Sequence, residues 1–188
     1  TIGNLSDAVR YLTDAVEAHP RDATAQALLG GVLAESGCYA DARRHFETAI
    51  DAGAGTPGIY LSLARACAQA GDDAAAAKVY AGLVAQGEVP PEALNEYAWL
   101  LATSDDVTDA RRAVHLAERA CEMTQWQALP LIDTLGVAYA AAGEFEKAIK
   151  LLEQHKGLAQ NEQERAVIEK RLQRSEERRV GKECATGC

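Results

Sequence analysis

Small apolar residues recur along the chain every 34 positions, inside stretches whose apolar side chains follow helical spacing. Ala8, Ala42 and Ala76 form one such column, and each is followed four positions later by a large side chain. Several independent columns that share one period predict a repeated structural unit. The other columns with this spacing are Leu12, Phe46 and Tyr80; Ala15, Ala49 and Leu83; Gly30, Ala64 and Ala98; and Gly37 and Gly71.

The period is lengthened once, because Ala98 and Gly136 are separated by 38 positions instead of 34. The additional residues fall in the polar segment 104–108, which predicts a longer loop between two helices. After this loop the pattern resumes, with Gly143, Phe145 and Ala148 at the spacing of Gly37, Tyr39 and Ala42.

Each column has a physical role in an antiparallel helical hairpin. Small residues let the two helices of one hairpin approach closely. A glycine after the first helix accepts the left-handed conformation that ends it. Together with abundant alanine, leucine, glutamate and arginine, the pattern predicts an all-α fold. The expected helices are 5–18, 22–36, 39–52, 57–70, 73–87, 90–103, 109–123, 129–142, 145–158 and 161–173.

These helices group into one domain, residues 1–173. We expect a half repeat at about 5–20, repeats at 23–56, 57–90, 91–128 and 129–160, and a capping helix at 161–173. We expect helix 5–18 to be the second helix of a hairpin whose first helix is missing. The last helix covers the exposed end of the array, as terminal repeats must.

Composition narrows the possible ligands. The formal net charge is −9, and an acidic surface repels a phosphate backbone, so we expect no nucleic acid partner. No apolar run approaches the length that a membrane span needs, and no signal peptide opens the sequence, so we expect no direct membrane contact in this segment. The cytoplasm is favoured, while a periplasmic location stays open if a signal or anchor precedes Thr1.

Residues that could act in catalysis or bind a metal ion are few and scattered along the chain. Each of the four histidines lies in a different repeat, without a carboxylate or cysteine at metal-ligand spacing, and the cysteines form no CxxC pair. No nucleophile, zinc-protease, phosphate-loop or dinucleotide motif occurs. The sequence therefore predicts no enzyme activity, no cofactor and no metal site.

The column pattern over residues 5–160 resembles the tetratricopeptide repeat. One stretch carries the most specific match, namely residues 93–103, followed by 113–121 and then 131–136; it resembles the C-terminal repeats of large bacterial tetratricopeptide proteins. The resemblance implies a right-handed superhelical solenoid and a scaffold that binds a partner protein or peptide in its concave groove.

In this architecture the first helices of successive hairpins line the groove. Their positions point to a candidate partner-binding set, in which Trp99 supplies a large amphipathic contact. Whether Trp99 binds a partner or packs between hairpins stays open, as does mutual hydrogen bonding of Asn95 and Asp133. With its acidic residues the groove would accept a mixed or basic segment. The candidate residues are Arg65, Gln69, Asn95, Glu96, Trp99 and Asp133.

Residues 174–188 form a separate segment. Its first eleven residues, RSEERRVGKEC, resemble a translated sequencing adapter, so we expect an artefactual or disordered tail. Without this segment the formal net charge is −10.

Two other functions remain possible. The repeats could be the partner-recruiting module of a larger bacterial enzyme or membrane protein, such as a glycosyltransferase or secretion component. They could also form an RNA-binding array of similar period, although the acidic charge opposes it.

Overall fold

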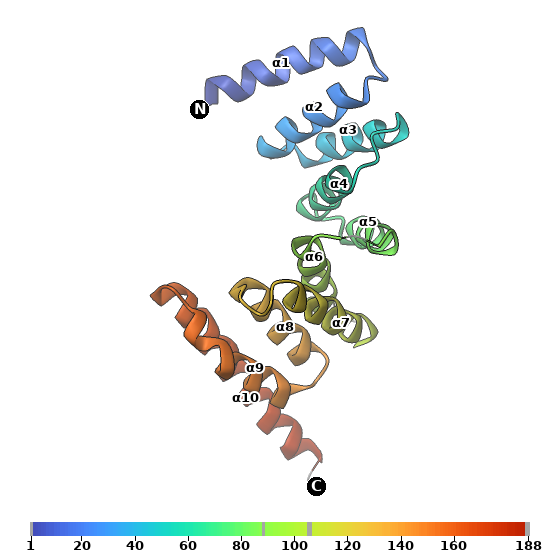
Figure 1. The fold of residues 1–188 in the computed structure, drawn as a ribbon. Helices are drawn as coiled ribbons and strands as arrows, with labels where there is room; N and C mark the ends of the chain where they lie inside the picture. The colour runs from blue at the N-terminus through green and yellow to red at the C-terminus, as the bar shows by residue number, and fades with distance from the viewer. Residues whose placement is uncertain (1, 88, 105–106, 187–188) are drawn as a thin grey trace. The chain divides into compact units, whose positions relative to one another are not determined.

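The computed structural model describes residues 2–87, 89–104 and 107–186, and all regular structure in these ranges is helical. Within these ranges ten α-helices follow one another with short connections (Figure 1). The chain forms two compact units, residues 1–89 and 90–188. The all-α prediction is confirmed.

The described residues of the first unit form five helices. Each helix packs against its neighbour in the chain, and α2 also contacts α4, so successive first helices lie along one side of the unit. The helices are α1 (Ile2–Ala18), α2 (Ala23–Glu35), α3 (Tyr39–Asp51), α4 (Pro57–Gln69) and α5 (Asp73–Ala85).

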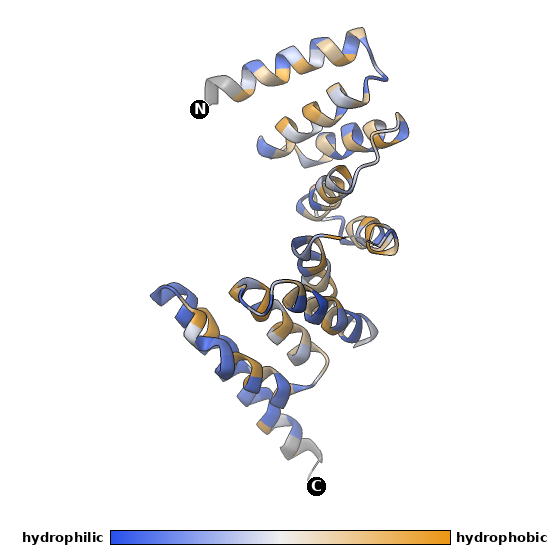
Figure 2. Cartoon of the chain, viewed as in Figure 1, coloured by the Kyte–Doolittle hydropathy of each residue, from blue (hydrophilic) through white to orange (hydrophobic). Residues whose placement is uncertain are grey.

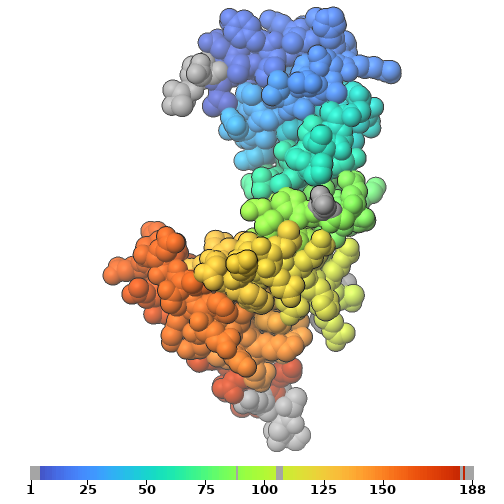
Figure 3. All heavy atoms as spheres, viewed as in Figure 1, coloured from blue at the N-terminus to red at the C-terminus, as the bar shows by residue number. Residues whose placement is uncertain are grey.

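The second unit repeats this arrangement. The first helices α6 and α8 contact each other as α2 and α4 do, and α10 packs against α9 and α8 (Figures 1 and 3). Its helices are α6 (Pro91–Ala102), α7 (Val107–Met123), α8 (Leu129–Ala141), α9 (Phe145–His155), a 3-10 turn (Lys156–Leu158) and α10 (Glu162–Thr186).

The predicted columns form the core of both units. Ala42, Ala76 and Ala148 are 0% exposed, and the large residues four positions later are also buried. In the first unit the Phe46 ring lies over Gly30 of its own hairpin, and in the second the Leu152 side chain lies over Gly136. The small residues are therefore needed where two helices cross, as the sequence predicts.

Helix ends follow local chemistry. Asp22 accepts hydrogen bonds from the backbone N–H groups of Thr24 and Ala25 at the start of α2, and Asp72 accepts one from Ala75 at the start of α5. Gly71 follows α4, which is the first helix of its hairpin, and has a φ of 80°. This left-handed conformation ends the helix. Side-chain caps and glycine stops thus set several of the helix bounds.

The C-terminal segment differs from expectation. Residues 174–186 are not disordered but continue α10, where Ser175 is only 4% exposed, and residues 187–188 lie outside the described part of the chain. The capping helix therefore does not end at residue 173. Most of its surface is hydrophilic, in keeping with a terminal helix (Figure 2). The likeness of this segment to an adapter translation stays a prediction.

Part of the predicted loop at 104–108 also falls outside the description, namely residues 105–106. Thr108 on its far side already belongs to α7, so that helix begins earlier than expected.

Candidate functional site

The candidate residues of the second unit lie on the two first helices, α6 and α8. Trp99 of α6 is 40% exposed, although it is the largest side chain of a helix whose other face is buried. It does not serve as a core residue between hairpins, unlike its neighbours Tyr97 and Ala98, which are 1% and 0% exposed.

Asp133 of α8 is paired across the unit with Arg171 of α10. The Arg171 Nε donates to Asp133 Oδ1 at 3.2 Å, and its Nη2 donates to Oδ2 at 3.4 Å. Both side chains are partly buried, with exposed fractions of 27% for Arg171 and 20% for Asp133. This bidentate arrangement fixes the guanidinium plane and neutralises the carboxylate.

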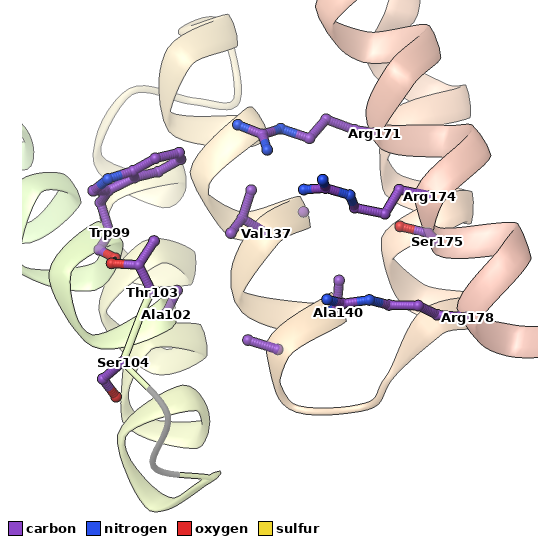
Figure 4. A pocket seen from close by; sticks show the side chains of 12 residues that line it. Trp99, Ala102, Thr103, Ser104, Val137, Ala140, Arg171, Arg174, Ser175 and Arg178 are labelled. Carbon is purple, nitrogen blue, oxygen red and sulfur yellow. The ribbon is translucent and has the colours of Figure 1, made fainter. Parts of the chain in front are cut away.

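The same guanidinium also contacts Trp99. The Arg171 Cζ lies 5.4 Å from the centroid of the Trp99 ring, within the range of a cation–π contact. Figure 4 shows the Trp99 and Arg171 side chains pointing toward each other from α6 and α10. Asp133 of α8 therefore fixes the position of Arg171 of α10, and Arg171 in turn contacts the Trp99 indole of α6. Side chains from these three helices thus form one surface.

Beside this cluster lies an open cleft of about 560 Å³ (Figure 4). Trp99 forms one wall, and every residue that α8 contributes is glycine, alanine or valine. The α10 side is polar and includes two exposed arginines from the C-terminal segment. The lining residues are Trp99, Ala102, Thr103, Ser104, Gly136, Val137, Ala140, Ala141, Arg171, Arg174, Ser175 and Arg178.

Asn95 lies one turn before Trp99 on α6. Its Oδ1 atom is buried and has no hydrogen-bond partner among the described residues. The mutual hydrogen bonding of Asn95 and Asp133 that the sequence left open is not seen, because the Asp133 carboxylate bonds to Arg171. Glu96, the remaining candidate of this unit, is half-buried on the same helix.

Arg65 and Gln69 belong to the other unit. Both are exposed on α4, near its C-terminal end. The structure thus brings Trp99 and Asp133 together through Arg171, with Asn95 on the same helix as Trp99. A continuous groove from Arg65 to Asp133 stays a prediction.

Sequence reasoning did not select Arg171, although it is the residue that joins the other two. A possible signal was its position, since Arg171 follows Asp133 by 38 residues, the same separation as between Asn95 and Asp133. The sequence places Arg171 in the capping helix 161–173, outside the predicted groove, so this spacing alone does not select it.

Two tyrosines, one on α6 and one on α8, contact side chains of α7 and have raised pKa values. Burial raises the pKa of the Tyr97 phenol, and the Arg112 guanidinium opposes this shift, with its Cζ 5.1 Å from the ring centroid. Burial also raises the pKa of Tyr139, whose hydroxyl donates to Glu118 at 2.6 Å. Among the described residues no three histidine, cysteine or acidic side chains gather as a metal site.

No helix in the described part of the chain has the length and apolar character to cross a membrane.

Solved structures share the fold across most of the chain. The structure of YrrB, described as a tetratricopeptide protein with an unusual peptide-binding site, is 21% identical over 90% of this chain and 85% of its own, with a TM-score of 0.77. The MamA protein is 17% identical over 84% of each chain, with a TM-score of 0.75. A tetratricopeptide repeat protein from Parabacteroides merdae is 14% identical over 97% of this chain and 73% of its own, with a TM-score of 0.76.

The comparison with curated proteins found no match. Family models described as tetratricopeptide repeat match residues 1–57, 33–89 and 131–166, which together exceed half of the chain. These matches fall on the columns from which the repeat was predicted, and the packing of Phe46 on Gly30 and Leu152 on Gly136 gives the columns their physical meaning. The chain therefore belongs to the tetratricopeptide repeat family.

Proposed function

We propose that this chain is a protein-interaction scaffold, and that the surface of α6, α8 and α10 around Trp99 binds a segment of a partner protein. The observation that carries the proposal is the exposed indole of Trp99, held by Arg171 beside an open cleft. Tryptophan is among the residues that dominate binding energy at protein interfaces.

Preorganisation strengthens this argument. A side chain that is already fixed before binding loses less conformational entropy when a partner arrives. The Asp133–Arg171 pair fixes the cation that lies against the indole, so part of this ordering cost is met during folding. The printed description of YrrB as a protein with a peptide-binding site gives a precedent for peptide binding on a similar fold.

The family also favours a scaffold over an enzyme, because tetratricopeptide repeats are in general interaction modules. We infer a binding role without catalysis for the described helices. Arg65 and Gln69 would extend the binding surface if a partner also contacts α4.

The test is a selection from a phage-displayed library of random peptides against the full chain. We expect the recovered peptides to bind the Trp99→Ala variant about 30-fold more weakly, which corresponds to the loss of a hot spot of about 2 kcal/mol. Met123→Ala is the matched control, because Met123 is a comparably exposed apolar residue of the same unit that does not line the cleft.

Far-UV circular dichroism and thermal melts would show that both variants keep the wild-type helical fold. Recovered peptides that bind wild-type protein and the Trp99→Ala variant equally would place the binding surface elsewhere. A folded chain that recovers no peptide at all would contradict the proposed site.

A further inference from the structure

We propose that the partner segment extends past the Asp133–Arg171 pair into a second pocket, between the first turns of α8 and α10. There it places a large apolar side chain, with a basic residue next to it. This inference rests on the proposed function and adds a ligand site beyond the Trp99 cleft. The expectation of a mixed or basic segment stays a prediction, and this pocket gives it a position.

The second pocket is small and mostly apolar, with a volume of about 290 Å³. Leu129 and Pro130 of α8 and Val167 and Ile168 of α10 contribute its apolar surface. Ile168 is 2% exposed, whereas Val167 beside it is 46% exposed and stays open to a ligand. Pockets for drug-sized ligands usually measure about 300–1,000 Å³, so this one suits a single side chain.

The polar groups of this pocket already have partners, apart from the exposed Gln163. Asn161 Nδ2 donates to Glu164 Oε1 at 3.0 Å, and the Glu164 backbone N–H donates to Asn161 Oδ1 at 2.9 Å. The Asp133 carboxylate accepts from Arg171. A polar side chain that entered the pocket would lose water without finding groups that need a partner, so an apolar side chain is favoured.

The charges at the pocket select the neighbour of this apolar side chain. Asp133 and Glu164 are part of the lining, and no basic side chain lines it among the described residues. Arg171 neutralises Asp133, but Glu164 forms no ion pair in the described part of the chain. Its carboxylate accepts only from the Gln160 N–H and the Asn161 amide, which leaves lone pairs for an ammonium or guanidinium group. The start of α10 offsets part of this charge, so the basic residue should add less affinity than the apolar one.

The Asp133–Arg171 pair separates two cavities of different character. The cleft beside Trp99 carries Arg171, Arg174 and Arg178 and no carboxylate, whereas the second pocket has carboxylates and no basic side chain among its described lining residues. All residues that form the second pocket precede Arg174. The proposal is therefore independent of the segment that resembles a sequencing adapter.

The pocket also has a defined place along a bound segment. Val167 lies one helical turn before Arg171, so their Cβ atoms are about 5–6 Å apart. The Arg171 Cζ in turn lies 5.4 Å from the centroid of the Trp99 ring. An extended segment advances about 3.3 Å per residue, so the apolar residue belongs about three to five positions from the residue that contacts Trp99.

The test uses peptides that are selected from a random phage-displayed library on the full chain and are then scanned with alanine. We expect each Trp99-dependent binder to contain a leucine, isoleucine, methionine or phenylalanine whose change to alanine weakens binding about tenfold on wild-type protein. On the Val167→Asp variant, which places a charge in the pocket, the same change should have less than about a twofold effect. Ala166→Asp is the matched control and should keep the tenfold effect, because Ala166 is the exposed neighbouring residue and does not line the pocket.

The basic residue has its own readout. Its exchange for glutamine in the same peptide should weaken binding about threefold on wild-type protein and leave binding to the Glu164→Gln variant unchanged. Glutamine can keep the capping hydrogen bonds at the start of α10, so this variant should stay folded. Glu162→Gln removes the same charge from an exposed residue outside the pocket and is the control. Far-UV circular dichroism verifies the fold of every variant.

The outcomes separate the second pocket from the Trp99 site. Trp99-dependent binders whose apolar residue responds equally to Val167→Asp and Ala166→Asp, or that carry an acidic residue beside it, would refute the pocket and leave the proposed function intact. Binders that lose affinity in Val167→Asp but not in Trp99→Ala would keep the pocket and refute the Trp99 site. A folded chain that recovers no binder would refute both.

A second copy of the chain is the alternative occupant. Sedimentation velocity of the wild-type protein and the two aspartate variants tests it, and we expect no dimer that depends on the pocket. A wild-type dimer that is lost in Val167→Asp but kept in Ala166→Asp would overturn the proposal, because a second copy would then fill the pocket.

Discussion

His45 Nδ1 of α3 lies 2.7 Å from Gln26 Oε1 of α2, and this contact fixes the protonation of the imidazole. The Gln26 side-chain nitrogen donates to the Pro20 carbonyl at 2.7 Å, so its oxygen is the acceptor and His45 Nδ1 carries the hydrogen. Gln26 is only 4% exposed, which makes this short chain of hydrogen bonds a buried link between α3 and the turn before α2.

Removal of the His45 donor should destabilise the first unit. His45→Leu leaves the buried Gln26 oxygen without its donor, and we expect a loss of about 1–2 kcal/mol in the free energy of unfolding. His45→Asn places an amide N–H near the position of Nδ1 and should lose less than half as much. Urea denaturation of both variants measures the difference, and equal losses would show that ring packing, not the hydrogen bond, matters.

The same histidine predicts a pH dependence of stability. Burial, assisted by the nearby Arg44, lowers the pKa of His45 below its ordinary value of 6.5, while Asp41 opposes the shift. The unfolded chain therefore binds a proton at higher pH than the folded chain does. The stabilisation from neutral His45 is fully present above pH 6.5 and is lost as the pH falls from there through the lowered pKa of the folded state. Thermal melts between pH 7.5 and 5 should show a steeper decline for wild type than for His45→Asn; parallel curves would exclude this contribution.

Two adjacent glycines of α2 should respond to alanine in opposite directions. A Cβ at Gly30 would lie 3.0 Å from two carbons of the buried Phe46 ring and 3.2 Å from the Ala42 carbonyl oxygen. We expect Gly30→Ala to cost about 1–3 kcal/mol of stability through overpacking. A Cβ at Gly31 meets nothing within 4 Å, so Gly31→Ala should stabilise the helix by about 1 kcal/mol. Chemical denaturation of the two variants checks both signs, and a neutral Gly30→Ala would mean that the hairpin opens to accept the methyl group.

The glycine pair illustrates what the sequence could predict. Gly30 belongs to a column with Ala64, Ala98 and Gly136, and a small residue at a helix crossing is a local requirement that repeats in every hairpin. Helix stops such as Gly71 are equally local. From α2 to α8 both ends of each helix therefore agree with the predicted ends to within two residues.

The site was less predictable because it depends on contacts between helices far apart in the sequence. The sequence places Trp99 on a first helix but leaves open whether its side chain is exposed or packs between hairpins. Its partner Arg171 comes from α10, whose placement on α8 no local pattern specifies. The turn after α7 shows the same limit. Gln125 and Trp126 adopt φ values of 51° and 60° without any glycine, and the Trp126 ring stacks on His155 at 5.9 Å between centroids. Tertiary packing imposes this backbone, against the preference of both residues.

Cysteine reactivity gives a final test of the packing. Burial raises the pKa of Cys121 from 9.0 to about 12, with Glu118 and Glu122 adding to the shift, whereas Cys38 is exposed. Because the thiolate is the reactive form, a shift of this size slows alkylation of Cys121 about a thousandfold at pH 8, before its burial is considered.

In a Cys184→Ser, Cys188→Ser background, iodoacetamide should label Cys38 first in the native protein. Buried Cys67 and Cys121 should react only when urea unfolds their own units. Mass spectrometry of the labelled peptides then reports the stability of each unit separately, because Cys67 lies in residues 1–89 and Cys121 in residues 90–188. Native-state labelling of Cys121 at the rate of Cys38 would contradict the close packing of α7 against α6 and α8. Simultaneous protection loss at Cys67 and Cys121 along the urea titration would show that residues 1–89 and 90–188 unfold in one transition and not as two separate units.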